Sequence, residues 1–360
     1  MKLFLFSCQK FTKYTCKIKY PLYYILKADI KIFRVLYKYY IMRKKIFLFP
    51  NPDFDRKYMG GISRLYQIFC KEYNFNLEII DDNFLRNHKP SEDKKSLIVI
   101  AGGDGTIHKA INAIPEKFFS SYKFGLIPSG TANEFTKSLN LPYFLEDAAF
   151  LIANENEENN ILHKVATVTA EGIAITSGLL APTILQSELE LRKEKYKFLT
   201  GLLYGVACQV ILSTSQNAKI FWGAFAYNLP AFMSLVNFYD HIKKFKMDSM
   251  EFQTGYLIIN NASLISKDLA FEDTKDENKD LFSCIYVSPD VTPSDMLWLL
   301  IRNQAHISIL QDPSIFYTQM KEINLEFEEK SLFMLDGELY EFSSPVNIKH
   351  HEECIEIICP

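Results

Sequence analysis

The stretch LIVIAGGDGTIHKAINAI, residues 97–114, places three glycines around one aspartate, between an apolar run and a helical pattern. A phosphate chain binds where backbone N–H groups are not covered by side chains, at the positive end of a helix. Gly102, Gly103 and Gly105 would permit close approach and a positive φ, and Thr106 would cap the helix. Asp104 beside phosphates requires a cation between them, so we expect Mg²⁺, held directly or through water. Taken alone, the loop also fits an ordinary strand–helix turn.

A second loop of the same kind follows about 25 residues later, in IPSGTANEF (127–135). Two such loops at the carboxyl ends of strands in one sheet form a cleft, where open α/β sheets bind ligands. Neither loop is a P-loop, and the last glycine of a GxGxxG pattern is replaced by His108, which we interpret as a helix-surface residue. The nucleotide would be held by backbone amides, hydroxyls and metal. The residues of the second loop that we assign to it are Ser129, Gly130, Thr131 and Asn133, with Glu134 in the first helical turn as a second metal ligand through water.

A third candidate is LDGEL (335–339), far downstream in a β-rich part of the chain. Asp-Gly is a common hairpin turn, and both carboxylates would then be solvated. If instead this turn faces the cleft, one carboxylate takes the proton from an attacking hydroxyl, and Glu338 and Asp336 are the pair for that role.

The elements that must position these loops fall into two parts. Residues 43–150 alternate strand and helix patterns, which predicts an α/β domain with a parallel sheet. Residues 151–360 contain many β-like runs with helix-like stretches at 185–213 and 292–310, which predicts a second, mainly antiparallel, β-sandwich-like domain. The C-terminal end is a candidate to return to the first domain. Residues 1–42 are a basic aromatic extension, or translation begins at Met42.

Composition limits the functional class. The first 45 residues carry twelve Lys or Arg against one Asp, while the remainder is acidic, which argues against a nucleic-acid partner. The seven cysteines form no CxxC pair, which indicates a reducing compartment, and no apolar run reaches the ~18 residues that span a bilayer. We therefore expect a cytoplasmic protein, which the basic aromatic residues 1–42, if translated, would associate peripherally with membrane. A homodimer is one candidate assembly.

The three motifs GGDGT, PSGTANEF and LDGE, in this order, resemble the diacylglycerol kinase catalytic family, which includes bacterial soluble lipid kinases and sphingosine-kinase-like proteins. The resemblance covers about residues 43–360. It implies an α/β nucleotide domain followed by a β-sandwich-like lipid domain, with ATP in the cleft between them. By position, it implies that Asn51, Gly102–Thr106 and Gly130–Asn133 hold ATP and that Glu338 is the proton acceptor. Some relatives assign the base to the aspartate of the first loop, so Asp104 is also a candidate.

The resemblance implies an ATP- and Mg²⁺-dependent kinase that acts on a lipid hydroxyl at a membrane surface, with diacylglycerol as the leading substrate. One alternative is a kinase with a soluble substrate such as NAD, because that group shares the GGDGT loop. Another is a degenerate member that binds nucleotide or membrane and regulates without catalysis. Departures from the family pattern favour the latter: residues 51–61 read NPDFDRKYMGG where the family usually has NPxSG, and Glu134 stands where the family has Asp.

Overall fold

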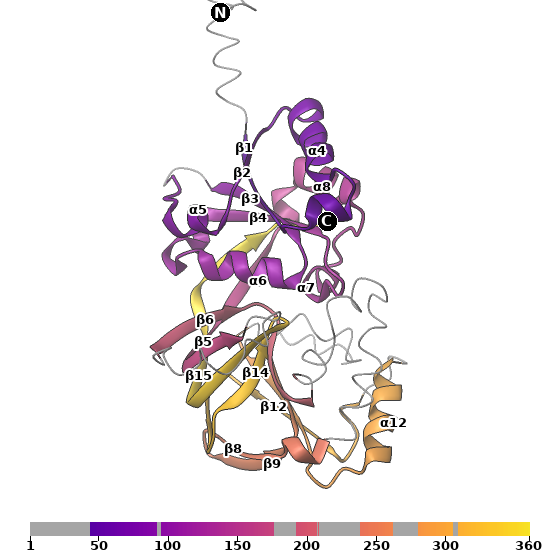
Figure 1. The fold of residues 1–360 in the computed structure, drawn as a ribbon, viewed down its shortest axis with the longest axis vertical. Helices are drawn as coiled ribbons and strands as arrows, with labels where there is room; N and C mark the ends of the chain where they lie inside the picture. Colours follow the sequence, from indigo (N-terminus) through magenta and orange to yellow (C-terminus); the bar gives the residue numbers. More distant parts are fainter. Residues whose placement is uncertain are drawn as a thin grey trace, which may run out of the picture.

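The computed structural model describes residues 44–91, 95–175, 192–206, 208, 238–261, 280–304 and 309–360. The extension predicted for residues 1–42 lies outside this range. Figure 1 shows two stacked parts: a layered helix-and-sheet part formed by the first half of the chain, and a β-rich part formed by the second half.

The first part is built on parallel strands in the order β2-β1-β3-β4. Every residue of β1 from Ile46 to Phe49 is buried, because helices cover both faces of this sheet. One face packs against α5 and α6, and the other against α4 and α8. The elements are β1 (Lys45–Pro50), α3 (Phe54–Lys57), α4 (Gly61–Tyr66, continued by π-helical turns to Glu72), β2 (Asn76–Ile79), α5 (Asp82–Asn87), β3 (Ser96–Gly102), α6 (Asp104–Ala113), β4 (Tyr122–Pro128), α7 (Glu134–Ser138) and α8 (Leu145–Ala153).

The second part is antiparallel, and its strands enclose an apolar core that includes Phe198, Phe333 and Phe342. One helix, α12 (Pro293–Gln304), packs on the face of β10 and β11. The strands are β5 (Ile161–Ile175), β6 (Arg192–Phe198), β7 (Gly201–Gly205), β8 (Lys243–Met247), β9 (Met250–Thr254), β10 (Tyr256–Asn261), β11 (Phe282–Val287), β12 (Ile315–Met320), β13 (Glu322–Phe327), β14 (Ser331–Leu335) and β15 (Glu338–Ile357).

The long strand β15 connects the two parts. Its first residues pair with β14, nearly its whole length pairs with β5, and its last residues, Glu356 and Ile357, also pair in parallel with Lys123 and Phe124 of β4. The end of the chain therefore adds a strand to the edge of the parallel sheet, and the turn before β15 is held close to the first part.

The helix predicted over 185–213 is wrong for residues 192–205, because residues 192–198 and 201–205 form the strands β6 and β7. Val206 and Cys208, the other described residues of this stretch, are helical. Tyr196 and Phe198 are buried, as are Leu202 and Tyr204. These pairs follow the two-residue period of a strand, and their burial in the core of the second part decides the conformation. In the range 292–310, the helix α12 forms as predicted.

Candidate active site

The two glycine loops lie against each other at the carboxyl ends of β3 and β4. Ser129 N donates to Gly102 O at 2.9 Å, and a Cβ placed on Gly103 would lie 2.6 Å from the Cα of Gly130. The chain thus needs glycine here for close backbone approach. The positive-φ residues of the described chain include neither Gly102, Gly103 nor Gly105, so the positive φ predicted for the first loop does not occur there.

Asn133 closes the second loop. It has a left-handed conformation with φ 53°, and its side-chain amide is buried. Its Oδ1 accepts from Gly130 N at 2.8 Å, and its Nδ2 donates to Gly130 O at 3.0 Å. Asn133 therefore shapes the loop, while Ser129, Gly130 and Thr131 line the space in front of it.

Asp104 connects the two loops. Its carboxylate accepts from the backbone N–H groups of Glu134 at 3.0 Å and Phe135 at 3.1 Å, so it caps the start of α7. Burial raises the pKa of Asp104, and these two hydrogen bonds act in the opposite direction. Glu134, the other predicted metal ligand, is exposed and pairs with Lys137 at 3.1 Å.

Asn51 and Thr106 meet at the entrance to α6. Asn51 follows β1, and its Nδ2 donates to Thr106 Oγ1 at 3.0 Å. The predicted capping role of Thr106 is wrong, because α6 begins after Gly103 and no side chain caps it. Sequence reasoning also missed Lys57, whose Nζ donates to the carbonyl oxygens of Ser129 and Gly130. Burial lowers the pKa of Lys57. A lysine shortly after the Asn-Pro turn was the available signal.

The Asp-Gly turn is a hairpin between β14 and β15, with positive φ at Asp336 (50°) and Gly337 (89°). Such a turn favours Asp-Gly, as the sequence predicted. The carboxylate of Asp336 is not solvated, however, since only 7% of the residue is exposed. The turn faces the first part of the molecule, as the alternative interpretation required.

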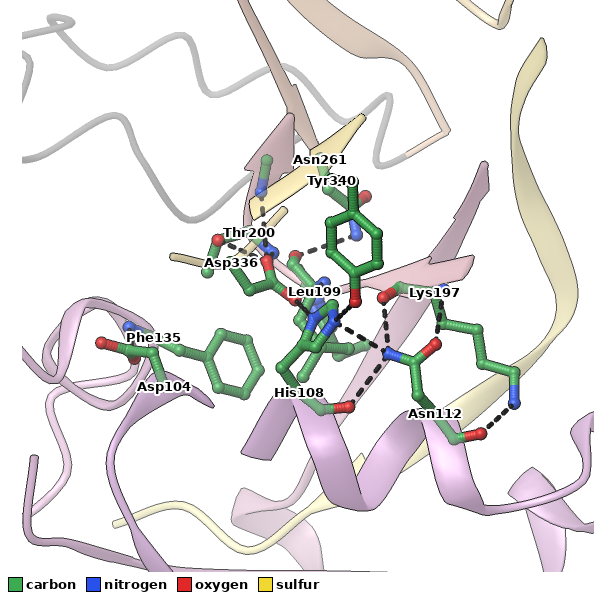
Figure 2. Close-up of polar contacts among 12 residues, drawn as sticks. Asp104, His108, Asn112, Phe135, Lys197, Leu199, Thr200, Asn261, Asp336 and Tyr340 are labelled. Atoms are coloured by element: carbon green, nitrogen blue, oxygen red, sulfur yellow. Dashed lines mark hydrogen bonds and ion pairs between the residues drawn. The ribbon is translucent and has the colours of Figure 1, made fainter. Parts of the chain in front are cut away.

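Asp336 is held by five donors (Figure 2). Oδ2 accepts from Leu199 N at 2.8 Å and pairs with His108 Nδ1 at 3.1 Å, while Oδ1 accepts from Thr200 N at 2.8 Å. Oδ1 also accepts from Thr200 Oγ1 at 2.6 Å and from Gly201 N at 3.4 Å. Burial alone would raise the pKa of Asp336, but the hydrogen bonds from His108 and Thr200 lower it. This carboxylate is therefore a fixed anion.

His108 is not the helix-surface residue that the sequence suggested, because only 4% of it is exposed. Its two ring nitrogens connect Asp336 with the hydroxyl of Tyr340, the latter at 2.6 Å. One turn later on α6, Asn112 exchanges two hydrogen bonds of 2.9 Å with the backbone of Lys197 on β6. The face of α6 that carries His108 and Asn112 thus packs on the second part, as Figure 2 shows.

Lys197 completes this contact. Its Nζ reaches the carbonyl oxygens at the end of α6, at 2.7 Å from Ile114 O and 3.3 Å from Ile111 O. Burial lowers the pKa of Lys197 to about 8. The C-terminal end of α6, the helix that starts at Asp104, is thereby held by the second part of the molecule.

Glu338 begins β15 and lines the same space as the glycine loops. A Cβ on Gly105 would lie 2.3 Å from Glu338 Oε1, so the carboxylate lies over the first turn of α6. Asp104 and Glu338 therefore belong to one cavity of about 980 Å³ between the two parts. The predicted site residues that line it are Asn51, Gly103, Asp104, Gly105, Thr106, Ser129, Gly130, Thr131, Glu134, Asp336 and Glu338.

One wall of the cavity is apolar. It is formed by Leu203 of β7, Tyr256 and Ile258 of β10, and Met334 before the Asp-Gly turn. Two residues beyond Ile258, Asn260 is 3% exposed, and its Oδ1 has no hydrogen-bond partner among the residues that the structure describes. A buried amide oxygen without a partner is unfavourable, and it marks a place where a ligand donor would be accommodated.

The residues present fit a nucleoside triphosphate with a divalent cation. Among the described residues that line the cavity there are several carboxylates but a single basic side chain, that of Lys109, so a phosphate chain there requires a further positive charge. Each oxygen of Asp104 accepts one backbone N–H and keeps a second lone pair, which suits a cation ligand. Within the described residues there is no cluster of three or more metal-ligating side chains, so the phosphates would supply part of the coordination.

Comparisons with known proteins agree with this geometry. A model of the diacylglycerol kinase catalytic domain matches residues 66–165. A diacylglycerol kinase of Staphylococcus carnosus is 23% identical over 329 residues, covering 89% of this chain and 96% of its own length. One from Staphylococcus epidermidis is also 23% identical and is covered over 93% of its length.

Solved structures show the same fold. Two structures of a putative diacylglycerol kinase from Bacillus anthracis match with TM-scores of 0.58 and 0.56, at 15% and 17% sequence identity. They cover 89% and 88% of this chain, and 98% and 97% of their own. The predicted fold class, a parallel α/β part followed by an antiparallel part, is confirmed. None of the described helices has both the length and the apolar character that crossing a bilayer requires.

Proposed function

Since the chain belongs to the diacylglycerol kinase catalytic domain family, we propose that it transfers the γ-phosphoryl group of ATP to a lipid hydroxyl, with diacylglycerol as acceptor and phosphatidic acid as product. The observation that carries this proposal is the shared cavity. Glu338 and the two glycine loops face the same space, and one wall of that space is apolar.

ATP would lie along the two loops, with backbone N–H groups and the hydroxyls of Ser129 and Thr131 directed at its phosphates. Asn51 and Thr106 would fix the first loop through their mutual hydrogen bond. Mg²⁺, held by Asp104 and through water by Glu134, would neutralise charge on the phosphates. Lys57 lies behind the second loop and sets the orientation of its carbonyl groups.

Glu338 is the proton acceptor in this proposal. As the lipid oxygen forms its bond to the γ-phosphorus and the bond to the ADP oxygen breaks, the hydroxyl proton passes to Glu338. Asp336 does not serve as the base, because its oxygens already accept five hydrogen bonds. It is a positioning residue that fixes the turn from which Glu338 projects.

The apolar wall supports a lipid acceptor over a soluble one such as NAD. Along one face of β10, the side chains change from polar Asn260 to apolar Ile258 and Tyr256. Residues two apart on a strand point to the same face, at intervals of roughly 7 Å. A lipid would place its polar end near Asn260 and Glu338, and its acyl chain along Ile258 and Tyr256.

The test is to incubate the purified protein with Mg²⁺ and ATP labelled at the γ-phosphate, in the presence of vesicles that contain diacylglycerol and, separately, of NAD. We expect label in phosphatidic acid. Label in NAD alone would show a soluble-substrate kinase. Thermal stabilisation by Mg-ATP without transfer to any acceptor would show a non-catalytic regulator.

A further inference from the structure

The helix α12 exposes apolar side chains on the side that faces away from the protein. Leu297, Trp298 and Ile301 are 39%, 57% and 48% exposed, within little more than one turn. On its other side, Met296 and Leu299 are buried at 7% exposure each. A helix that packs on one side normally carries polar residues on the other, so the three exposed side chains mark an interaction surface.

The helix itself is well formed. Thr292 precedes it, and Thr292 Oγ1 accepts from Asp295 N at 3.2 Å while Asp295 Oδ2 accepts from Thr292 N at 3.0 Å. This reciprocal arrangement is a capping box. The helix start is thus fixed, and the exposed side chains are presented on a rigid element that lies at the edge of the β-rich part (Figure 1).

The inner side of α12 is continuous with the apolar wall of the cavity. Met296 and Leu299 belong to the same cluster as Ile258, and Leu203 and Tyr256 pack against that cluster. Ile258, Leu203 and Tyr256 also line the cavity. A lipid chain that runs along β10 away from Glu338 therefore leads toward α12.

We propose that the outer face of α12, formed by Leu297, Trp298 and Ile301, docks on a lipid bilayer and places the apolar end of the cavity next to the membrane. The proposal rests on the lipid kinase function proposed above. Large apolar side chains with an indole suit the interface between headgroups and acyl chains.

Charge complementarity does not drive this docking. Asp295 is part of the cap, and Arg302, the basic residue of α12, pairs with Asp312 at 3.3 Å. Binding should therefore depend on apolar insertion, occur on uncharged phosphatidylcholine, and change little between low and high salt.

A second exposed apolar group provides a matched control. Tyr143, Phe144 and Phe150, near and on α8, are 57%, 70% and 58% exposed. The core cluster that contains α8 has no buried member among the residues that line the cavity. Replacing these three side chains removes a similar apolar area without changing the approach to the site.

The experiment compares three proteins in co-sedimentation with phosphatidylcholine vesicles: wild type, the α12 variant L297Q/W298Q/I301Q and the control variant Y143Q/F144Q/F150Q. Glutamine keeps helix propensity, and thermal unfolding checks the fold of each. We expect the α12 variant to bind vesicles at least about tenfold more weakly, and the control to bind like wild type. In a Trp222→Phe background, the emission of Trp298 should shift to shorter wavelength when vesicles are added.

A turnover assay with a monomeric short-chain diacylglycerol, without vesicles, separates this inference from the proposed function. The docking proposal is overturned if wild type does not bind vesicles, if the α12 variant binds as well as wild type, or if the control variant loses binding equally. If binding depends on α12 but none of the three proteins phosphorylates the short-chain lipid, docking holds and the proposed kinase function fails.

Discussion

Replacing Asp336 by asparagine separates the two carboxylates of the Asp-Gly-Glu turn. An asparagine has one acceptor oxygen, whereas the Asp336 carboxylate uses both oxygens. If the NH₂ group takes the place of Oδ2, it faces Leu199 N and His108 Nδ1, which lie at 2.8 and 3.1 Å in the wild type. His108 can change tautomer and accept, but the N–H of Leu199 cannot. One buried backbone donor is left without a partner.

The magnitude follows from these contacts. A buried donor without a partner costs about 1–3 kcal/mol, and the loss of the negative charge also weakens the hydrogen bonds from Thr200. The opposite orientation of the amide is worse, because it leaves two backbone donors, Thr200 N and Gly201 N, facing the NH₂ group. We expect Asp336→Asn to lower the free energy of unfolding by about 2–4 kcal/mol.

The assay is equilibrium urea denaturation of wild type, Asp336→Asn and Glu338→Gln. The Glu338 side chain lines the cavity, so its variant should stay within about 0.5 kcal/mol of wild type. Because the folded-state pKa of Asp336 is lowered, its ionised form stabilises the protein above the unfolded value of ~3.9. The difference between wild type and Asp336→Asn should then shrink as the pH falls below that value. Equal stability of wild type and Asp336→Asn at neutral pH would refute the positioning role.

Three further predictions concern the loops and the cavity. Gly103→Ala should abolish thermal stabilisation by Mg-ATP, because the added Cβ would clash with the backbone of Gly130. In Gly105→Ala the added Cβ would contact only the flexible end of Glu338, so this variant should keep the thermal shift with Mg-ATP and mainly lose turnover. Because burial lowers the pKa of Lys197 to about 8, the unfolded chain binds the extra proton above that pH, so wild type should gain stability relative to Lys197→Met between pH 8 and the ordinary lysine value of ~10.4. If the difference in unfolding free energy between wild type and Lys197→Met stayed constant over this pH range, the prediction would be contradicted. Asn260→Leu should raise the KM for the lipid with little change in nucleotide binding, and an unaltered lipid KM would exclude contact of Asn260 with the acceptor.

The position of the two glycine loops was predictable from the sequence. The carboxyl ends of parallel strands meet at one edge of a sheet, so loops that follow β3 and β4 must be neighbours. The Asp-Gly hairpin was also visible, because two consecutive positive φ values favour this dipeptide. What the sequence left open was whether this turn faces the loops.

The answer depends on pairings that no local pattern contains. The end of β15 pairs with β4, which brings the start of the same strand toward α6. The sequence of α6 shows one apolar face for the sheet, and His108 lies outside that face. Only the packing of β6 and β15 against the helix shows that His108 is buried and paired with Asp336.

The assignment of residues 192–205 to a helix was wrong for a related reason. In residues 192–205, the apolar side chains of β6 and β7 satisfy both helical and strand spacing over short windows, and tertiary pairing with β5, β10 and β14 selects the strand. Asp336 was assigned as a catalytic group because its residue type and its position beside Glu338 suit a base, and no local pattern shows that its oxygens are already occupied. Its five donors, from Leu199, Thr200, Gly201 and His108, come from distant segments.

The most direct test of the central claim is the single-turnover rate of phosphoryl transfer from bound Mg-ATP to diacylglycerol, measured for wild type and Glu338→Gln at saturating nucleotide. The account predicts labelled phosphatidic acid from wild type and a rate lower by roughly 10²–10⁴ in the variant, with unchanged affinity for ATP. Equal rates in the two proteins, or no transfer to lipid by wild type, would contradict it.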